Sequence, residues 1–100
     1  MAGLIWGEGA ILDLEGIYDY IARDSYQYAK HQIKRIYRSV EHLQHFPESG
    51  RHVPEFPHLP HREIIVDNFR VIYRYDAESD IVLIVTVVHV RRLLRKDVLT

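Results

Sequence analysis

The sequence lacks cysteine and has only 5 glycines and 4 prolines in 100 residues. The absence of cysteine excludes disulfide bonds, zinc sites with cysteine ligands and a thiol nucleophile. The longest nearly unbroken apolar run, Ile81 to Val88, is far shorter than the ~20 residues that span a bilayer. No basic flank precedes an apolar segment near Met1, so we expect no signal peptide. These features predict a cytoplasmic protein that does not enter a membrane.

The sequence also lacks an excess of charge of either sign. The 13 Lys and Arg residues against 14 Asp and Glu residues give a formal net charge of -1. Proteins that coat nucleic acids are normally strongly basic, so the composition argues against that class. The balance is nevertheless uneven, because four cations lie between Arg91 and Lys96. A local contact with RNA or with an acidic protein at the end of the chain stays compatible with this sequence.

Several motifs of cofactor-dependent enzymes are missing as well. The sequence has no GxGxxG, Walker or GxSxG motif, which argues against nucleotide binding of those types and against α/β-hydrolase chemistry. Six of the seven histidines precede Arg62, but no HExxH motif or third ligand completes a zinc spacing. We expect no metal and no cofactor. The length predicts a single domain over residues 1–100 with one modest core.

The first half of the chain has the period of amphipathic helices. A short strand, Gly3 to Trp6, precedes a helix whose apolar residues recur at steps of three and four between Ile11 and Ile21. Ser25 is suited to cap a second helix, which we expect to end at Pro47. Two such helices joined by a short link predict an antiparallel hairpin.

The second half of the chain reads as strands. All four prolines lie between Pro47 and His61, so this segment is predicted to be a loop. Three strands follow, separated by turns at Asp67-Asn68 and at residues 76–80, and the most apolar of them is expected to be central in the sheet. The predicted strands are Arg62–Val66, Phe69–Tyr75 and Ile81–Val90. The fold class is therefore α+β, with the helical hairpin on one face of a mainly antiparallel sheet.

Two arginines occupy one face of the predicted strand Phe69–Tyr75. Arg70 and Arg74 share this face because strand side chains alternate. A guanidinium donates hydrogen bonds in a planar fork, which suits the recognition of phosphate or carboxylate. The alternative is that these arginines form cross-strand ion pairs with Glu63 or Asp76.

His89 stands at the end of the most apolar strand and is a candidate general acid or base. The alternative is a structural histidine bonded to Asp67 or to a backbone carbonyl. If the last two strands pair symmetrically about their turn, Arg70 lies opposite Thr86 and His89 shares a face with Tyr73. A shift of one residue would instead bring His89 to the face of Arg70.

Four segments of the sequence, in this order, resemble the RelE/ParE toxins of bacterial type II toxin–antitoxin modules, often described as plasmid-stabilisation proteins. The resemblance extends from about Leu4 to Leu94 and implies a helical hairpin packed on a mainly antiparallel sheet. The segments are LEGIYDYIA from Leu14, FPESGR with VPE from Phe46, RE with V and NFRVIYR from Arg62, and VVHVRRLL from Val87.

The resemblance implies a growth-inhibiting toxin that a cognate antitoxin holds inactive, as a homodimer or as a toxin–antitoxin hetero-oligomer. ParE-like members inhibit DNA gyrase, whereas RelE-like members cleave mRNA on the ribosome without a metal. The near-neutral charge and the absence of lysines from the loop before the strands favour a ParE-like toxin over an mRNA endoribonuclease. A non-toxic α+β binding module that keeps the antitoxin surface is a third interpretation.

The resemblance also implies a set of site residues. Cleavage of RNA by its own 2′-hydroxyl requires a base, an acid and cations that stabilise the charge on phosphorus. For a nuclease, the resemblance assigns catalysis to Arg70, His89 and Glu55. Contacts to phosphate or to the target are expected from the remaining candidates, which are Arg51, Arg74, Arg91 and Arg92.

Overall fold

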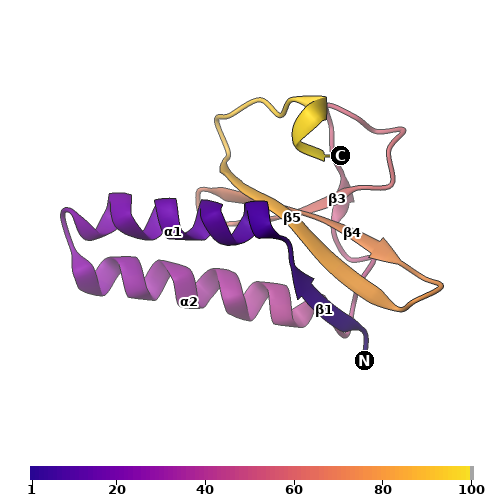
Figure 1. Ribbon diagram of the computed structural model, residues 1–100, viewed down its shortest axis with the longest axis horizontal. Helices are drawn as coiled ribbons and strands as arrows, with labels where there is room; N and C mark the ends of the chain where they lie inside the picture. Colours follow the sequence, from indigo (N-terminus) through magenta and orange to yellow (C-terminus); the bar gives the residue numbers. More distant parts are fainter. Residues whose placement is uncertain (100) are drawn as a thin grey trace.

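The computed structural model describes residues 1–99 of the chain, which form a helical hairpin packed on a five-stranded sheet (Figure 1). The predicted α+β fold and its order of elements are confirmed. The elements are β1 (Gly3–Trp6), α1 (Glu8–Ala22), α2 (Tyr26–His42), β2 (Arg51–His52), β3 (Arg62–Val66), β4 (Phe69–Asp76), β5 (Ile81–His89) and the 3-10 helix η1 (Lys96–Leu99).

The two helices begin and end for local reasons. The hydroxyl of Ser25 accepts a hydrogen bond from the backbone N–H of Tyr28 at 3.1 Å, so the predicted N-cap of α2 is confirmed. The prediction that α2 extends to Pro47 is wrong, because the helix ends at His42. Beyond that point the backbone tightens into bonds between residues three apart, such as the one from Gln44 N–H to Glu41 O at 3.1 Å. No helix in residues 1–99 is long and apolar enough to cross a membrane.

The sheet has the order β1-β5-β4-β3-β2. β1 is parallel to β5, and every other pair is antiparallel. β5 was predicted to be the central strand, but β4 occupies the middle of the sheet, and β5 is the interior strand between β1 and β4. The proline-containing segment holds one element that we did not predict, the two-residue strand β2, in which Arg51 lies opposite Glu63.

The pairing of β4 with β5 changes register part-way along the strands. Near the turn Asp76 lies opposite Ile81, one residue away from symmetric pairing. Between Ile72 and Tyr73 the register shifts again, so that Arg70 lies opposite Val88. The symmetric pairing of Arg70 with Thr86 is therefore wrong. The two shifts of one residue add up to two. At the far end of the strands, each side chain therefore lies on the same face of the sheet as symmetric pairing predicts.

A carboxylate from α1 accompanies this irregularity. Asp13 Oδ2 accepts a hydrogen bond from the hydroxyl of Thr86 at 2.5 Å and another from the backbone N–H of Val87 at 3.0 Å. Because a bulge disrupts the ladder locally, its backbone groups need partners outside the sheet. Asp13 supplies one and thereby joins α1 to β5.

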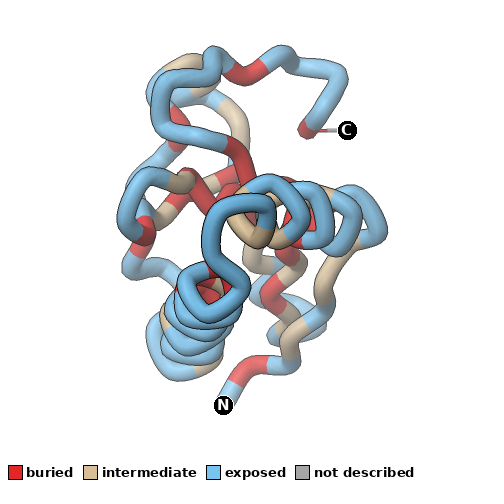
Figure 2. Tube along the Cα trace, turned by 90° about the vertical axis from the view of Figure 1, so that its left-hand side faces the viewer, coloured by how far each residue is buried: buried red, intermediate tan, exposed pale blue. Residues whose placement is uncertain are grey.

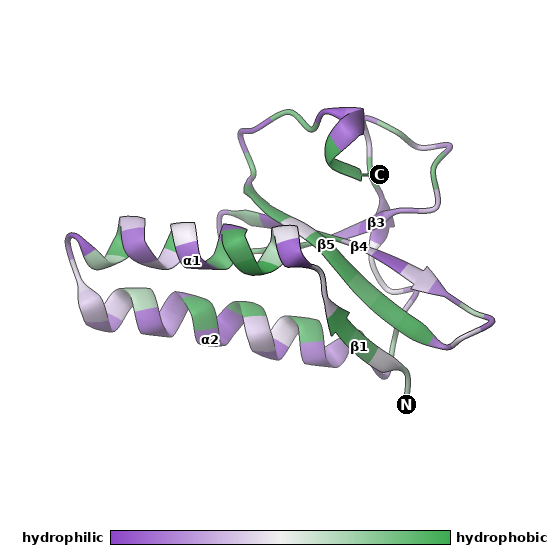
Figure 3. Ribbon diagram, viewed as in Figure 1, coloured by the Kyte–Doolittle hydropathy of each residue, from purple (hydrophilic) through white to green (hydrophobic). Residues whose placement is uncertain are grey.

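Apolar side chains are buried on both faces of the sheet. Figure 2 shows buried positions toward the middle of the molecule and at a few points of the loops, and Figure 3 shows the apolar character of β5. One cluster fills the space between the helical hairpin and the sheet and includes Ile36, Val71, Tyr73, Ile84 and Val87. The second cluster lies on the opposite face, beneath the proline-containing loop and the C-terminal segment, and contains Val53, Ile72, Val88, Leu94 and Leu99.

Candidate functional site

Arg70 lies on the face of the sheet that is turned away from the helices, opposite Val88 of the second cluster. Its Nε donates to Glu63 Oε1 at 2.9 Å, and its Nη2 donates to the same oxygen at 2.6 Å. Its Nη1 and Nη2 donate to the two oxygens of Glu55 at 2.8 and 2.7 Å. A fifth bond joins Nη1 to the carbonyl oxygen of Arg92 at 3.2 Å. A guanidinium has five N–H donors, so acceptors of the protein itself occupy all of them.

The network around Arg70 is electrically balanced. Glu63 also accepts from Arg51, whose Nε and Nη2 lie 2.8 and 2.7 Å from Oε2. Two arginines and two carboxylates therefore form one connected group, which we call the Arg70 network: Arg51, Glu55, Glu63 and Arg70. Glu63 is fully buried in its side chain and Arg70 is 7% exposed, so each buried charge requires its partner.

The hydrogen bonds of this network stabilise the charged forms of Glu55 and Arg70. The bidentate hydrogen bonds from Arg70 lower the pKa of Glu55 to about 2, aided by the backbone N–H of Leu94. Hydrogen bonds to Glu55 and Glu63 raise the pKa of Arg70 above its usual value. Glu55 is consequently a poor proton acceptor near neutral pH, since a general base works best with a pKa near the working pH.

The Arg70 network also holds the chain that follows β5. Glu55 Oε2 accepts from the backbone N–H of Leu94 at 3.0 Å, and the carbonyl of Arg92 accepts from Arg70. Two backbone groups of the C-terminal segment are thus bonded to one ion pair. The interpretation of Arg70 as a partner of Glu63 fits this geometry.

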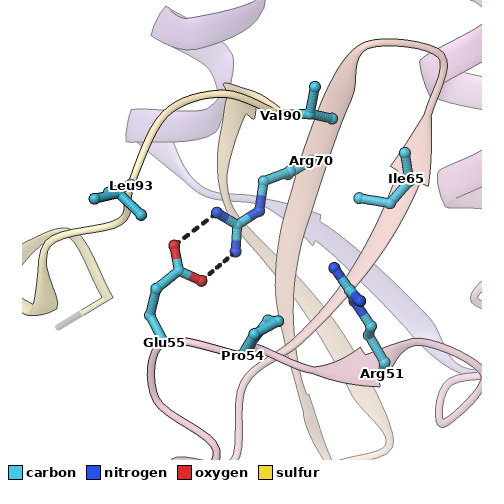
Figure 4. Close-up of a pocket in the computed structure, with 7 residues that line it drawn as sticks. All are labelled: Arg51, Pro54, Glu55, Ile65, Arg70, Val90 and Leu93. Carbon is cyan, nitrogen blue, oxygen red and sulfur yellow. Dashed lines mark hydrogen bonds and ion pairs between the residues drawn. The ribbon is translucent and has the colours of Figure 1, made fainter.

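A shallow pocket of about 370 Å³ opens beside the Arg70–Glu55 pair (Figure 4). Arg51 lies at one side of it, with 64% of its side chain exposed. Apolar side chains complete the rim, and they are Pro54, Ile65, Val90 and Leu93. Arg51 is therefore the cation of this pocket that a ligand reaches most easily.

His89 lies on the other face of the sheet from Arg70. It is opposite Phe69, and the two rings meet edge to face with centroids 5.8 Å apart. Phe69 packs against the cluster beneath the helices. The three-residue site of Arg70, His89 and Glu55 is therefore not assembled, because Arg70 and Glu55 meet on one face while His89 belongs to the other.

The imidazole of His89 accepts a hydrogen bond at Nδ1 from the backbone N–H of Arg91 at 3.1 Å. This bond places the ring proton of the neutral form on Nε2. The proposed bond from His89 to Asp67 is wrong, because Asp67 instead accepts from Arg35 at 2.7 Å and from Gln32 at 3.0 Å. Asp67 thereby joins α2 to the β3–β4 turn.

A groove of about 770 Å³ runs beside His89, between the helical hairpin and the end of the sheet. Its wall combines aromatic and polar side chains, and this composition is typical of a surface that contacts a partner. The lining residues that matter here are Tyr20, Tyr28, Asn68, Phe69, His89 and Arg92.

The remaining candidate cations do not converge on one point. Arg91 and Arg92 are exposed in the turn after β5, and Arg92 lines the groove beside His89. Arg74 is exposed on β4 and lies beside the buried His61, whose pKa is lowered by burial. Arg70 and Arg74 lie on the same face of the sheet, as predicted. Their surroundings differ, because Arg74, unlike Arg70, forms no ion pair with a residue in 1–99.

Two structural contacts were not predicted from the sequence. The hydroxyl of the buried Tyr73 accepts from the backbone N–H of Gly50 at 2.9 Å, and Asp13 caps the irregular segment of β5. Neither of these two contacts leaves a spacing signal in the sequence, since 23 and 74 residues separate the partners.

Within residues 1–99 no group of three His, Asp or Glu side chains is placed to hold a metal ion.

The family comparison decides the class of this protein. The family model described as "ParE toxin of type II toxin-antitoxin system, parDE" matches residues 4–94. This chain belongs to the ParE toxin family. The RelE/ParE resemblance of its sequence is thereby confirmed, and the protein is a toxin of that family.

Solved structures share the ParE fold of this chain. The chromosomal ParDE system of P. aeruginosa matches with 24% identity and a TM-score of 0.72, over 91% of this chain and 98% of that chain. The toxin–antitoxin complex RelBE2 of Mycobacterium tuberculosis matches with 19% identity and a TM-score of 0.59, over 88% and 96%. An arginine mutant of the E. coli toxin RelE in the free state matches with 15% identity and a TM-score of 0.56, over 99% and 92%. A comparison with curated proteins finds no match.

Proposed function

We propose that this ParE-family protein inhibits DNA gyrase when it is free of a cognate antitoxin. The observation that carries this choice of target is the saturation of Arg70, whose five donors are bonded to Glu55, Glu63 and the carbonyl of Arg92. An mRNA nuclease needs cations available to the phosphate in the transition state. A gyrase inhibitor acts by binding and does not require Arg70 to be free.

We further propose that the antitoxin occupies the groove beside His89. The P. aeruginosa and M. tuberculosis structures are described as toxin–antitoxin systems, and the groove, at about 770 Å³, has about twice the volume of the pocket beside Arg70. Tyr20 and Tyr28 expose 72% and 57% of their surface there, and Arg92 adds a cation. An antitoxin segment with apolar and acidic side chains fits this lining.

A second candidate function, mRNA cleavage, is favoured by one observation. His89 and Arg92 line the same groove, and the bond from Arg91 N–H to Nδ1 orients the imidazole. A histidine next to an arginine supplies an acid or base and a phosphate contact. In this case the site is built on His89 and Arg92 and excludes Arg70.

Induction of the protein alone in a bacterial culture tests these proposals. We expect growth arrest, with relaxed plasmid DNA and intact mRNA, and relief by the co-expressed antitoxin. The His89→Ala variant separates the candidates: cut mRNA that disappears in this variant contradicts the gyrase proposal and supports the nuclease. Normal growth with folded protein present contradicts both and supports a non-toxic binding module.

A further inference from the structure

The exposed side of α2 carries a row of cations. Lys30, Lys34 and Arg38 are all exposed and recur at intervals of four residues. A rise of 1.5 Å per residue places the first and last about 12 Å apart along the helix axis. Residues four apart are neighbours on a helix surface, so these like charges repel one another and destabilise α2 slightly. We call these three residues the α2 cation row.

The α2 cation row is not neutralised within the described chain. None of its members forms a salt bridge with another residue in 1–99. Glu41 is the one acidic residue of α2, while α1 holds four acids and no Lys or Arg. The net charge of -1 therefore conceals a separation of charge between the helices. Composition argued against a nucleic-acid partner, but this separation removes that argument for the surface of α2.

Aromatic side chains accompany these cations. Tyr26 is 57% exposed and Tyr37 is 44% exposed, and both lie on the side of α2 that carries the row, since Tyr26 precedes Lys30 by four residues and Tyr37 follows Lys34 by three. The Lys30 ammonium lies 4.4 Å from the centroid of the Tyr26 ring, which orients both side chains. Tyrosine hydroxyls, like Lys and Arg, donate hydrogen bonds to phosphate oxygens. Figure 1 shows α2 along the outside of the molecule, with its N-terminal half extending beyond the sheet.

We propose that the exposed face of α2 binds the phosphate backbone of duplex DNA without reading its sequence. The large apolar residues exposed on α2 are Tyr26, Tyr28 and Tyr37, with no Leu, Ile or Val among them. The three cations complement the negative charge of a phosphate backbone, and the hydroxyls of the neighbouring tyrosines add hydrogen-bond donors to phosphate oxygens. Figure 3 shows hydrophilic segments repeated along this helix. The proposal goes beyond the choice of gyrase as target and does not depend on it.

Fluorescence anisotropy of the full-length protein with a labelled short DNA duplex tests this proposal. Three phosphate contacts predict that log K falls with log salt concentration with a slope of about -2.7. Lys34→Glu with Arg38→Glu removes two contacts, so we expect a slope of about -0.9 or less steep and an affinity at least about tenfold lower at low salt.

A matched variant controls for net charge. Arg95→Glu with Lys96→Glu changes the charge equally at two exposed positions away from α2, and we expect it to alter affinity by less than about twofold. Equal losses in the two double variants would overturn the proposal, because the effect would then come from net charge alone. Absence of DNA binding at low salt would overturn it too, as would tighter binding of a polyglutamate peptide. None of these results bears on gyrase inhibition.

Discussion

Arg70 and Glu55 form a bidentate ion pair, with Nη1–Oε2 and Nη2–Oε1 distances of 2.8 and 2.7 Å. The pair connects β4 to the proline-containing loop, and its two residues also bond to backbone groups of Leu94 and Arg92. Three segments that are far apart in sequence therefore meet at one part-buried ion pair. This structural role of the ion pair accounts for the presence of Arg70 without a catalytic function.

Replacing Glu55 by Gln tests this structural role. The change keeps the shape of the side chain but leaves the Arg70 guanidinium with one carboxylate partner at a position that is 7% exposed. We expect the free energy of unfolding to fall by about 2 kcal/mol, because a buried charge loses part of its compensation. Urea denaturation followed by circular dichroism measures the loss. Glu78→Gln is the matched control, since Glu78 is exposed, and an equal effect in both variants would refute the role of Glu55.

The same ion pair predicts a dependence of stability on pH. The folded protein holds the pKa of Glu55 at about 2, below its ordinary value of 4.5. Stability from this group is therefore fully present above pH 4.5 and is lost as the pH falls towards 2. Denaturation series across this window should show a smaller acid-induced loss for Glu55→Gln than for the unchanged protein. Parallel curves for the two proteins would contradict the lowered pKa.

Gly50 is predicted to tolerate no side chain. A Cβ there would lie 2.6 Å from the Tyr73 hydroxyl and 2.7 Å from the Glu63 carbonyl oxygen. Gly50→Ala should therefore destabilise the protein by more than about 2 kcal/mol. Gly16→Ala, within α1 and with no atom within 4 Å of the new Cβ, should stabilise it by about 0.5–1 kcal/mol. Thermal unfolding of both variants tests these two predictions. A Gly50→Ala variant with unchanged stability would contradict the close packing around Gly50.

Asp13 is predicted to stabilise the irregular segment of β5. In Asp13→Ala the backbone N–H of Val87 and the hydroxyl of Thr86 lose their acceptor, which should cost about 1–3 kcal/mol. Asp19→Ala, at an exposed position of the same helix, should change stability by less than about 0.5 kcal/mol. Amide hydrogen exchange at Val87 gives a local reading. Unchanged protection of this amide in Asp13→Ala would show that the carboxylate is dispensable.

The strands and the capped second helix were predictable because their signals are local. Alternation, the Asp67-Asn68 turn and the Ser25 cap each depend on residues within a few positions, and β1 has the predicted bounds. The β4–β5 register was not predictable, because the shift beside Ile72 depends on pairing across the sheet. The sequence left two registers open for that reason.

The candidate site was predictable only in part. Sequence reasoning offered Glu63 as a partner of Arg70, and the structure contains this pair at 2.6 Å. The meeting of Glu55 with Arg70 across 15 residues depends on how the proline-containing loop closes over the sheet. The separation of His89 from Arg70 follows from the register, so the sequence alone gave no means of choosing their faces.

Incubation of the purified protein with DNA gyrase, relaxed plasmid and ATP, in parallel with translating ribosomes carrying mRNA, tests the central claim most directly. We predict inhibition of supercoiling, or accumulation of gyrase–DNA cleavage complexes, and no cutting of mRNA. Cleavage of ribosome-bound mRNA together with unimpaired supercoiling would contradict the proposed function.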